Sequence, residues 1–146
     1  MKDVNRLAYD LPTATASVDR VCREVDVWLT ECRLESERFP MAMLLRESLN
    51  NAVIHGNRSV ASSRLRCLVR RGRRWLQIEV EDDGPGFDWR HRLECRAGIE
   101  ECHGRGLQIY QIYSDDLRFN RRGNRVRLRR RISGGNTHVD SPGSEE

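Results

Sequence analysis

The chain has 146 residues, of which 38% are hydrophobic and 33% are charged, and its formal net charge is +4. This composition fits a soluble globular protein with one sizeable core. No apolar run approaches the roughly 20 residues that cross a bilayer, and no long apolar stretch follows the first residues, which argues against a membrane span and a signal peptide. We therefore expect a cytoplasmic protein.

Five cysteines are present, and none of them forms a Cys-x-x-Cys pair. The odd number and the spacing disfavour a disulfide framework and fit a reducing compartment. Cys95, Cys102 and His103 lie near one another in the sequence, but their spacing matches no standard zinc arrangement and no fourth ligand is evident. We expect these side chains to have no metal role.

The chain begins with a predicted strand and a predicted helix. Residues 4–11 form the strand, and Pro12 ends it. Thr15 or Ser17 can cap a helix that runs to about Cys32. Apolar side chains recur on one face of this helix at helical spacing and are expected to lie in the core. They are Val18, Val21, Cys22, Val25, Trp28, Leu29 and Cys32.

A second helix and a hairpin follow. The helix runs from about Pro40, which suits a first turn, to His55, and Gly56 with Asn57 supplies its stop. Residues 63–70 and 75–81 then alternate between apolar and polar side chains around a short turn. This pattern predicts a β-hairpin.

The remaining elements are a loop, a helix and a closing hairpin. Residues 88–103 carry mixed charges and little periodicity, which predicts a mobile segment. A third helix follows Gly106, and residues 117–119 and 125–132 form two strands around a Gly123-Asn124 turn.

The predicted element order is strand, helix, helix, strand, strand, loop, helix, strand, strand. It indicates an α+β fold, a two-layer sandwich in which helices cover one face of a mostly antiparallel mixed sheet. Residues 1–133 form one predicted domain. Residues 134–146 are rich in Gly, Asn, Ser, Pro and Glu, which predicts a disordered tail.

A dense run of arginines covers residues 121–131. Such a run can bind nucleic acid, or it can be an edge strand whose charges keep it soluble and unpaired. We favour the edge strand, because no aromatic side chains that could stack on bases are interleaved with the arginines.

Three polar residues are spaced four apart in the second helix. Glu47, Asn51 and His55 therefore lie on one helix face, which can be an exposed face or can project into a cleft. An amide oxygen next to a carboxylate suits Mg²⁺, which prefers oxygen ligands and keeps substrate phosphates in its shell. Asn51 could supply that oxygen, and Glu47 could deprotonate a nucleophile.

Two glycine-containing segments complete the pattern. Asp82-x-Gly84-x-Gly86-Phe87 follows the predicted hairpin. Its carboxylate could accept a hydrogen bond from an adenine amino group, and its glycines let a ligand approach the backbone. His103-Gly104-Arg105-Gly106-Leu107 precedes a helix, where free N–H groups, the helix dipole and an arginine favour phosphate. Each segment alone is weak, but the three in this order predict a nucleotide site.

These segments resemble the boxes of the GHKL ATPases, which have the Bergerat fold. Glu47-x-x-x-Asn51 with His55-Gly56-Asn57 resembles the N box, Asp82-x-Gly84-x-Gly86 the G1 box and Gly104-Arg105-Gly106-Leu107 the G2 box. The short format, an acidic residue at 115 or 116 and the Gly-Asn turn resemble the bacterial anti-sigma factor serine/threonine kinases. The resemblance covers about residues 6–133.

The resemblance implies a role for each matching position. Asn51 would ligate Mg²⁺, Glu47 would be the catalytic base, and Asp82 would bind the adenine amino group. Arg105 would offset phosphate charge during transfer, and residues 88–103 would be a lid over ATP. The residues expected to contact ATP are Asn51, His55, Gly56, Asp82, Gly84, Gly86, Phe87, His103, Gly104, Arg105, Gly106 and Leu107.

The resemblance also implies partners. The substrate would be a serine or threonine of an anti-anti-sigma protein, the second partner a sigma factor, and the chain a homodimer. The lid departs from the family because it is polar, with His91, Cys95, Cys102 and His103 in place of a Gly/Ser/Thr-rich segment. Alternatives are an ATP-dependent binding module that transfers nothing, a histidine-kinase-type catalytic domain, and a DNA-binding protein that uses residues 121–131.

Overall fold

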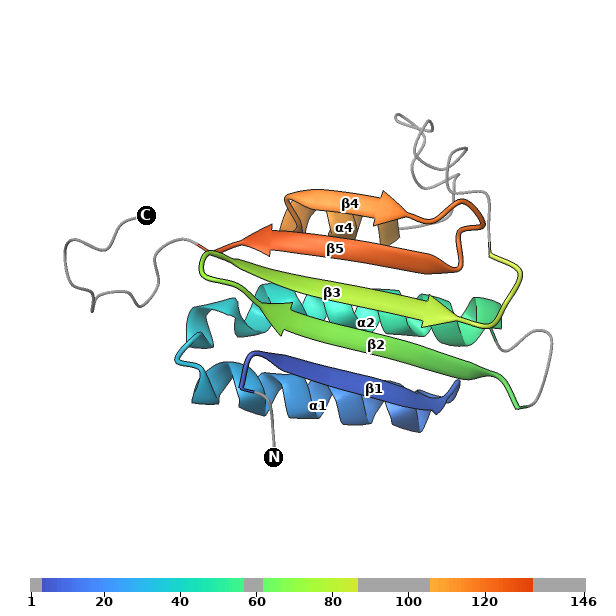
Figure 1. The fold of residues 1–146 in the computed structure, drawn as a ribbon, viewed down its shortest axis with the longest axis horizontal. Helices are drawn as coiled ribbons and strands as arrows, with labels where there is room; N and C mark the ends of the chain where they lie inside the picture. Colours follow the sequence, from blue (N-terminus) through green and yellow to red (C-terminus); the bar gives the residue numbers. More distant parts are fainter. Residues whose placement is uncertain (1–3, 57–61, 87–105, 133–146) are drawn as a thin grey trace.

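The computed structural model describes residues 4–56, 62–86 and 106–132. These residues form a two-layer α+β sandwich (Figure 1). The elements in chain order are β1 (Arg6–Pro12), α1 (Thr15–Glu31), η1 (Glu35–Glu37), α2 (Arg38–Gly56), β2 (Arg64–Arg71), β3 (Trp75–Asp82), α4 (Gly106–Tyr113), β4 (Asp116–Phe119) and β5 (Arg125–Arg131). The predicted order and fold class are confirmed, and the short 3₁₀ helix η1 was not predicted.

The strands form one sheet in the order β1-β2-β3-β5-β4. Every pairing among the described strands is antiparallel, so the expected mixed sheet is instead an antiparallel one. The helices α1, α2 and α4 lie behind one face of this sheet, with α1 beneath β1 and α4 behind β4 and β5 (Figure 1).

The core lies between the helices and the sheet. In β2 and β3 the buried side chains alternate as the sequence predicts, with Leu65, Cys67 and Val69 facing the same layer as the side chains of β3. The α1 stripe that includes Val18, Val21, Val25 and Leu29 is buried there too. Burial of apolar surface at roughly 25 cal/mol per Å² is what holds the two layers together.

The junction of β1 and α1 differs from the prediction. Pro12 does not follow the strand, as predicted, but is the last residue of β1 and pairs with Arg64. An edge strand tolerates a proline there because it costs no ladder bond. The N-cap residue of α1 is Ala14, so the predicted cap by Thr15 or Ser17 is wrong. Ser17 instead donates its hydroxyl to the carbonyl oxygen of Pro12 at 2.7 Å, which ties the helix to the end of the strand.

The arginine-rich strand is not an edge strand. β5 lies between β3 and β4 in the sheet, and it hydrogen-bonds to both. Arg125, Arg127 and Arg129 alternate with the buried Val126 and Leu128, so the arginines lie on the sheet face away from the helices. Acidic and amide neighbours hold two of them, because Arg127 pairs with Asp116 at 3.4 Å and Arg129 donates to Gln77.

Within the described ranges, no helix has the length and apolar character needed to cross a membrane. Cys22, Cys32 and Cys67 are free thiols, as the sequence predicts, while Cys95 and Cys102 lie outside the described residues. The predicted lid and the predicted tail also lie outside them.

Candidate functional site

The polar face of α2 forms one wall of a pocket at the end of the sheet where β3 finishes. Asn51 and His55 line this pocket, whereas the neighbouring Asn50 is exposed on another side of the helix. Of the two adjacent asparagines, Asn51 therefore lies on the pocket side of the helix. The pocket is open, and its empty volume of about 330 Å³ includes solvent at its mouth. Its lining residues are Ser48, Asn51, Ala52, His55, Val80, Asp82, Tyr110, Phe119, Gly123, Asn124, Arg125 and Val126.

Asp82 is the acidic residue at the base of this pocket. It is the last residue of β3, and the alternation of buried positions along the strand turns it toward the helix layer. Burial raises its pKa, although the backbone N–H of Gly84, which donates to Oδ1 at 2.7 Å, acts in the opposite direction. The second carboxylate oxygen, Oδ2, has no hydrogen bond within the described part of the chain. It remains a hydrogen-bond acceptor for a ligand.

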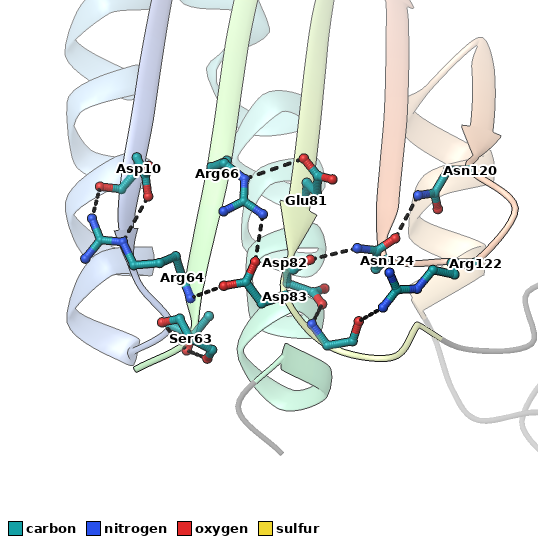
Figure 2. Close-up of polar contacts among 12 residues, drawn as sticks. Asp10, Ser63, Arg64, Arg66, Glu81, Asp82, Asp83, Asn120, Arg122 and Asn124 are labelled. Carbon is teal, nitrogen blue, oxygen red and sulfur yellow. Dashed lines mark hydrogen bonds and ion pairs between the residues drawn. The ribbon is translucent and has the colours of Figure 1, made fainter. Parts of the chain in front are cut away.

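The adjacent Asp83 is exposed and does not line the pocket. The backbone N–H of Arg64 donates to Oδ2 of Asp83, and the guanidinium of Arg66 to Oδ1, both at 2.9 Å (Figure 2). These two donors lower the pKa of Asp83. Two neighbouring carboxylates thus have opposite environments. Asp82, the buried one, is the residue that the sequence assigns to the contact with adenine.

Glycines allow the end of α2 to pass close to the loop after β3. A Cβ atom on Gly84 would lie 2.5 Å from the carbonyl oxygen of His55, and one on Gly56 would lie 2.9 Å from Cβ of Asp82. Real side chains do not tolerate such distances. Both positions therefore let the end of α2 and the loop after β3 pass close together.

Gly86 is needed for a different reason. Its φ of +87° lies in the left-handed region, and a side chain there would collide with the backbone of Arg122. The guanidinium of Arg122 also donates to the carbonyl oxygen of Gly84 at 3.1 Å (Figure 2). The loop after β3 is thus fixed to the turn between β4 and β5.

The sequence reasoning missed Asn124. Its side-chain amide donates to the carbonyl oxygen of Asp82 at 2.8 Å, and its own carbonyl oxygen accepts from the N–H of Asp82 at 3.0 Å. Asn120 in turn donates to Oδ1 of Asn124 at 2.7 Å (Figure 2). The sequence predicts only a turn at Gly123-Asn124, whereas Asn124 also holds the end of β3 through two hydrogen bonds to the backbone of Asp82.

Glu47 lies next to Asn51 and the first residue of α4. A Cβ atom on Gly106 would lie 2.7 Å from Oε2 of Glu47 and 3.6 Å from Nδ2 of Asn51. Burial raises the pKa of Glu47, and a hydrogen bond with Asn51 partly opposes that effect. The structure therefore brings together Glu47, Asn51 and Gly106, which come from two of the three sequence segments.

Several expected site residues lie outside the described part of the chain. They are Phe87, His103, Gly104 and Arg105, together with Asn57. Leu107 is described, and it is half-buried and packs against the core. Among the described residues no cluster of three or more His, Cys, Asp or Glu could hold a metal ion by itself. A metal at Asn51 would therefore need ligand oxygens such as phosphates, as Mg²⁺ commonly uses.

The geometry suits a Mg·ATP complex in two respects. A buried carboxylate at the pocket base is an acceptor for the amino group of adenine, in a pocket that also has apolar walls such as Val80 and Ala52. An amide and a carboxylate stand on the adjoining helix, and both carry oxygen atoms of the kind that Mg²⁺ prefers as ligands.

Residues 11–130 match the sequence profile of the histidine kinase-like ATPase domain. A search of curated proteins returned no significant match. Because the profile match covers most of the chain, this protein belongs to the histidine kinase-like ATPase domain family.

Proposed function

We propose that this domain is an ATP-dependent serine/threonine protein kinase of the anti-sigma factor type. In this proposal it binds Mg·ATP, transfers the γ-phosphoryl group to a serine or threonine of an anti-anti-sigma protein, and sequesters a sigma factor when that antagonist is phosphorylated. The family supplies ATP binding, and the kinase activity and partners are the proposed part.

The observation that carries the proposal is the position of Glu47. Its carboxylate is partly buried, adjoins Asn51, and faces the glycine that begins α4. A carboxylate with a raised pKa is a stronger proton acceptor than an ordinary one. A domain that only bound ATP would have no need for a base at this position.

The chemistry follows from that placement. The substrate hydroxyl oxygen attacks the γ-phosphorus, the bond to the β–γ bridging oxygen breaks, and ADP leaves, while Glu47 accepts the hydroxyl proton. Asn51 would hold Mg²⁺, which offsets charge on the phosphates. Asp82 would orient the adenine from the other end of the pocket. Arg105 is expected to contribute positive charge to the phosphates.

The test is incubation with ATP labelled in the γ-phosphate, Mg²⁺ and the small antagonist proteins encoded by the same genome. We expect acid-stable label on a serine or threonine of one antagonist. Glu47→Gln should slow this transfer by at least about 100-fold, the lower range for a general base, while the affinity for metal-free ATP is kept. Glu31→Gln is the matched control, because Glu31 is exposed at the end of α1, and it should transfer at the parent rate.

Other outcomes would replace the proposal. Acid-labile label on a histidine would favour the histidine-kinase alternative, since phosphohistidine is hydrolysed in acid. Bound ATP with no label on any antagonist would favour an ATP-dependent binding module. The expected homodimer is a separate prediction, which light scattering of the purified chain checks.

A further inference from the structure

Tyr110 is a buried tyrosine whose hydroxyl reaches the site. It lies on α4, is 3% exposed, and lines the pocket beside Asn51. It stands four residues after Gly106, so both face the same side of α4. The side-chain amide nitrogen of Asn51 donates to the Tyr110 hydroxyl oxygen at 3.2 Å. The family motif assigns no role to this position, and our sequence reasoning placed Tyr110 only in a helix.

Glu47 determines which way the Asn51 amide points. A carboxylate only accepts hydrogen bonds, so the side chain of Asn51 must turn its nitrogen, not its oxygen, toward Glu47. The atoms around Gly106 agree with this orientation, because a Cβ atom there would lie 2.7 Å from Oε2 of Glu47 and 3.6 Å from Nδ2 of Asn51. The amide nitrogen has two hydrogens, and the hydroxyl oxygen of Tyr110 accepts from that same nitrogen.

The amide oxygen of Asn51 is thereby left on the side away from both partners. We propose that Tyr110 is a positioning residue, which holds the amide nitrogen of Asn51 so that its oxygen Oδ1 is presented to the Mg²⁺ of Mg·ATP. Partners that orient a metal ligand in this way typically change metal affinity by about 10- to 100-fold when they are removed. The inference rests on the Mg·ATP site of the proposed function, but not on phosphoryl transfer.

The test separates metal-dependent from metal-independent nucleotide binding. Calorimetry measures the affinity for ATP with Mg²⁺ and with a chelator, in the parent and in Tyr110→Phe, which keeps the ring and removes the hydroxyl. We expect Tyr110→Phe to bind metal-free ATP with the same affinity as the parent. The increase in ATP affinity that Mg²⁺ causes should be roughly 10-fold smaller in this variant than in the parent. Tyr113→Phe is the matched control on the same helix, where the ring contacts Phe39, and it should keep the full gain.

A double-mutant cycle shows whether Tyr110 acts through Asn51. In an Asn51→Ala background, Tyr110→Phe should cause no further change in the effect of Mg²⁺. An unchanged gain from Mg²⁺ in Tyr110→Phe overturns the inference. So does an equal loss of affinity with and without Mg²⁺, because the hydroxyl would then support the fold alone. A parent protein that binds Mg·ATP but labels no antagonist refutes the kinase proposal and leaves this inference standing.

Discussion

Gly106 lies so close to Glu47 that a Cβ atom on the glycine would come within 2.7 Å of Oε2 of the carboxylate. The first residue of α4 and the polar face of α2 are therefore fitted to each other without room for a methyl group. Since α4 begins at this residue, any adjustment there moves the carboxylate that we propose as the base.

Gly106→Ala should slow phosphoryl transfer more than it weakens ATP binding. The added methyl group displaces the Glu47 side chain, and a shift of about 1 Å in a reacting group can cost on the order of 100-fold in rate. Single-turnover transfer and calorimetric ATP affinity, measured on the same preparation, separate the two effects. Transfer at the parent rate would show that the contact between Gly106 and Glu47 has no catalytic consequence.

Asp82→Asn should stabilise the nucleotide-free protein at neutral pH. Burial raises the pKa of Asp82 in the folded state, so the folded state binds a proton more tightly than the unfolded one. The contribution of Asp82 to stability is then present at low pH and is lost as pH rises through the raised pKa. Asparagine does not titrate, and the substitution removes this loss.

We expect a gain of roughly 1 kcal/mol at pH 7, a size typical of stabilising changes at functional sites. The gain should vanish as the pH falls below the ordinary aspartate value of 3.8, where both states are protonated. Urea unfolding across this range measures it. A variant that is less stable than the parent at pH 7 would show that the charged form of Asp82 is stabilising.

Glu37→Ala should destabilise the fold, because Glu37 is 6% exposed and forms an ion pair with Arg130. Arg130 also donates to the carbonyl oxygen of Tyr113 at 2.9 Å, so the pair connects η1, β5 and the end of α4. Without Glu37 the partly buried charge of Arg130 has lost its partner, and the free energy of unfolding should fall by about 2 kcal/mol.

The control for this pair is Asp19→Ala, which removes the partner of Arg46 in an exposed ion pair with both side chains 52% exposed. It should change stability by less than about 0.5 kcal/mol. Equal effects of the two substitutions in urea unfolding would contradict the role assigned to Glu37.

Local patterns predicted much of this fold. The alternation of Leu76, Ile78 and Val80 continues to Asp82, so the strand itself determines that Asp82 and not Asp83 turns inward. The four-residue spacing of Glu47 and Asn51 likewise places both on one face of α2. Such features depend on helix and strand periodicity alone.

Features that depend on contacts between distant elements could not be predicted in this way. β5 is an interior strand and still has a charged face, because the helices among the described elements cover only the other side of the sheet. Arg130 is in phase with the buried Val126 and Leu128, where an apolar side chain is expected, and it meets Glu37, which lies 93 positions away. Asn124 and Tyr110 join the site through partners 42 and 59 positions away, and nothing in the sequence near either residue indicates those partners.

The most direct test of the account is calorimetric titration of the parent, Asp82→Asn and Asp83→Asn with ATP and Mg²⁺. We predict one ATP per chain for the parent and affinity weaker by at least about 10-fold for Asp82→Asn, the cost of a hydrogen bond to a charged group. Asp83→Asn should keep parent-like affinity, because the Asp83 carboxylate is exposed and bound by Arg64 and Arg66. Absence of ATP binding by the parent, or equal affinity in all three proteins, would contradict the proposed nucleotide site.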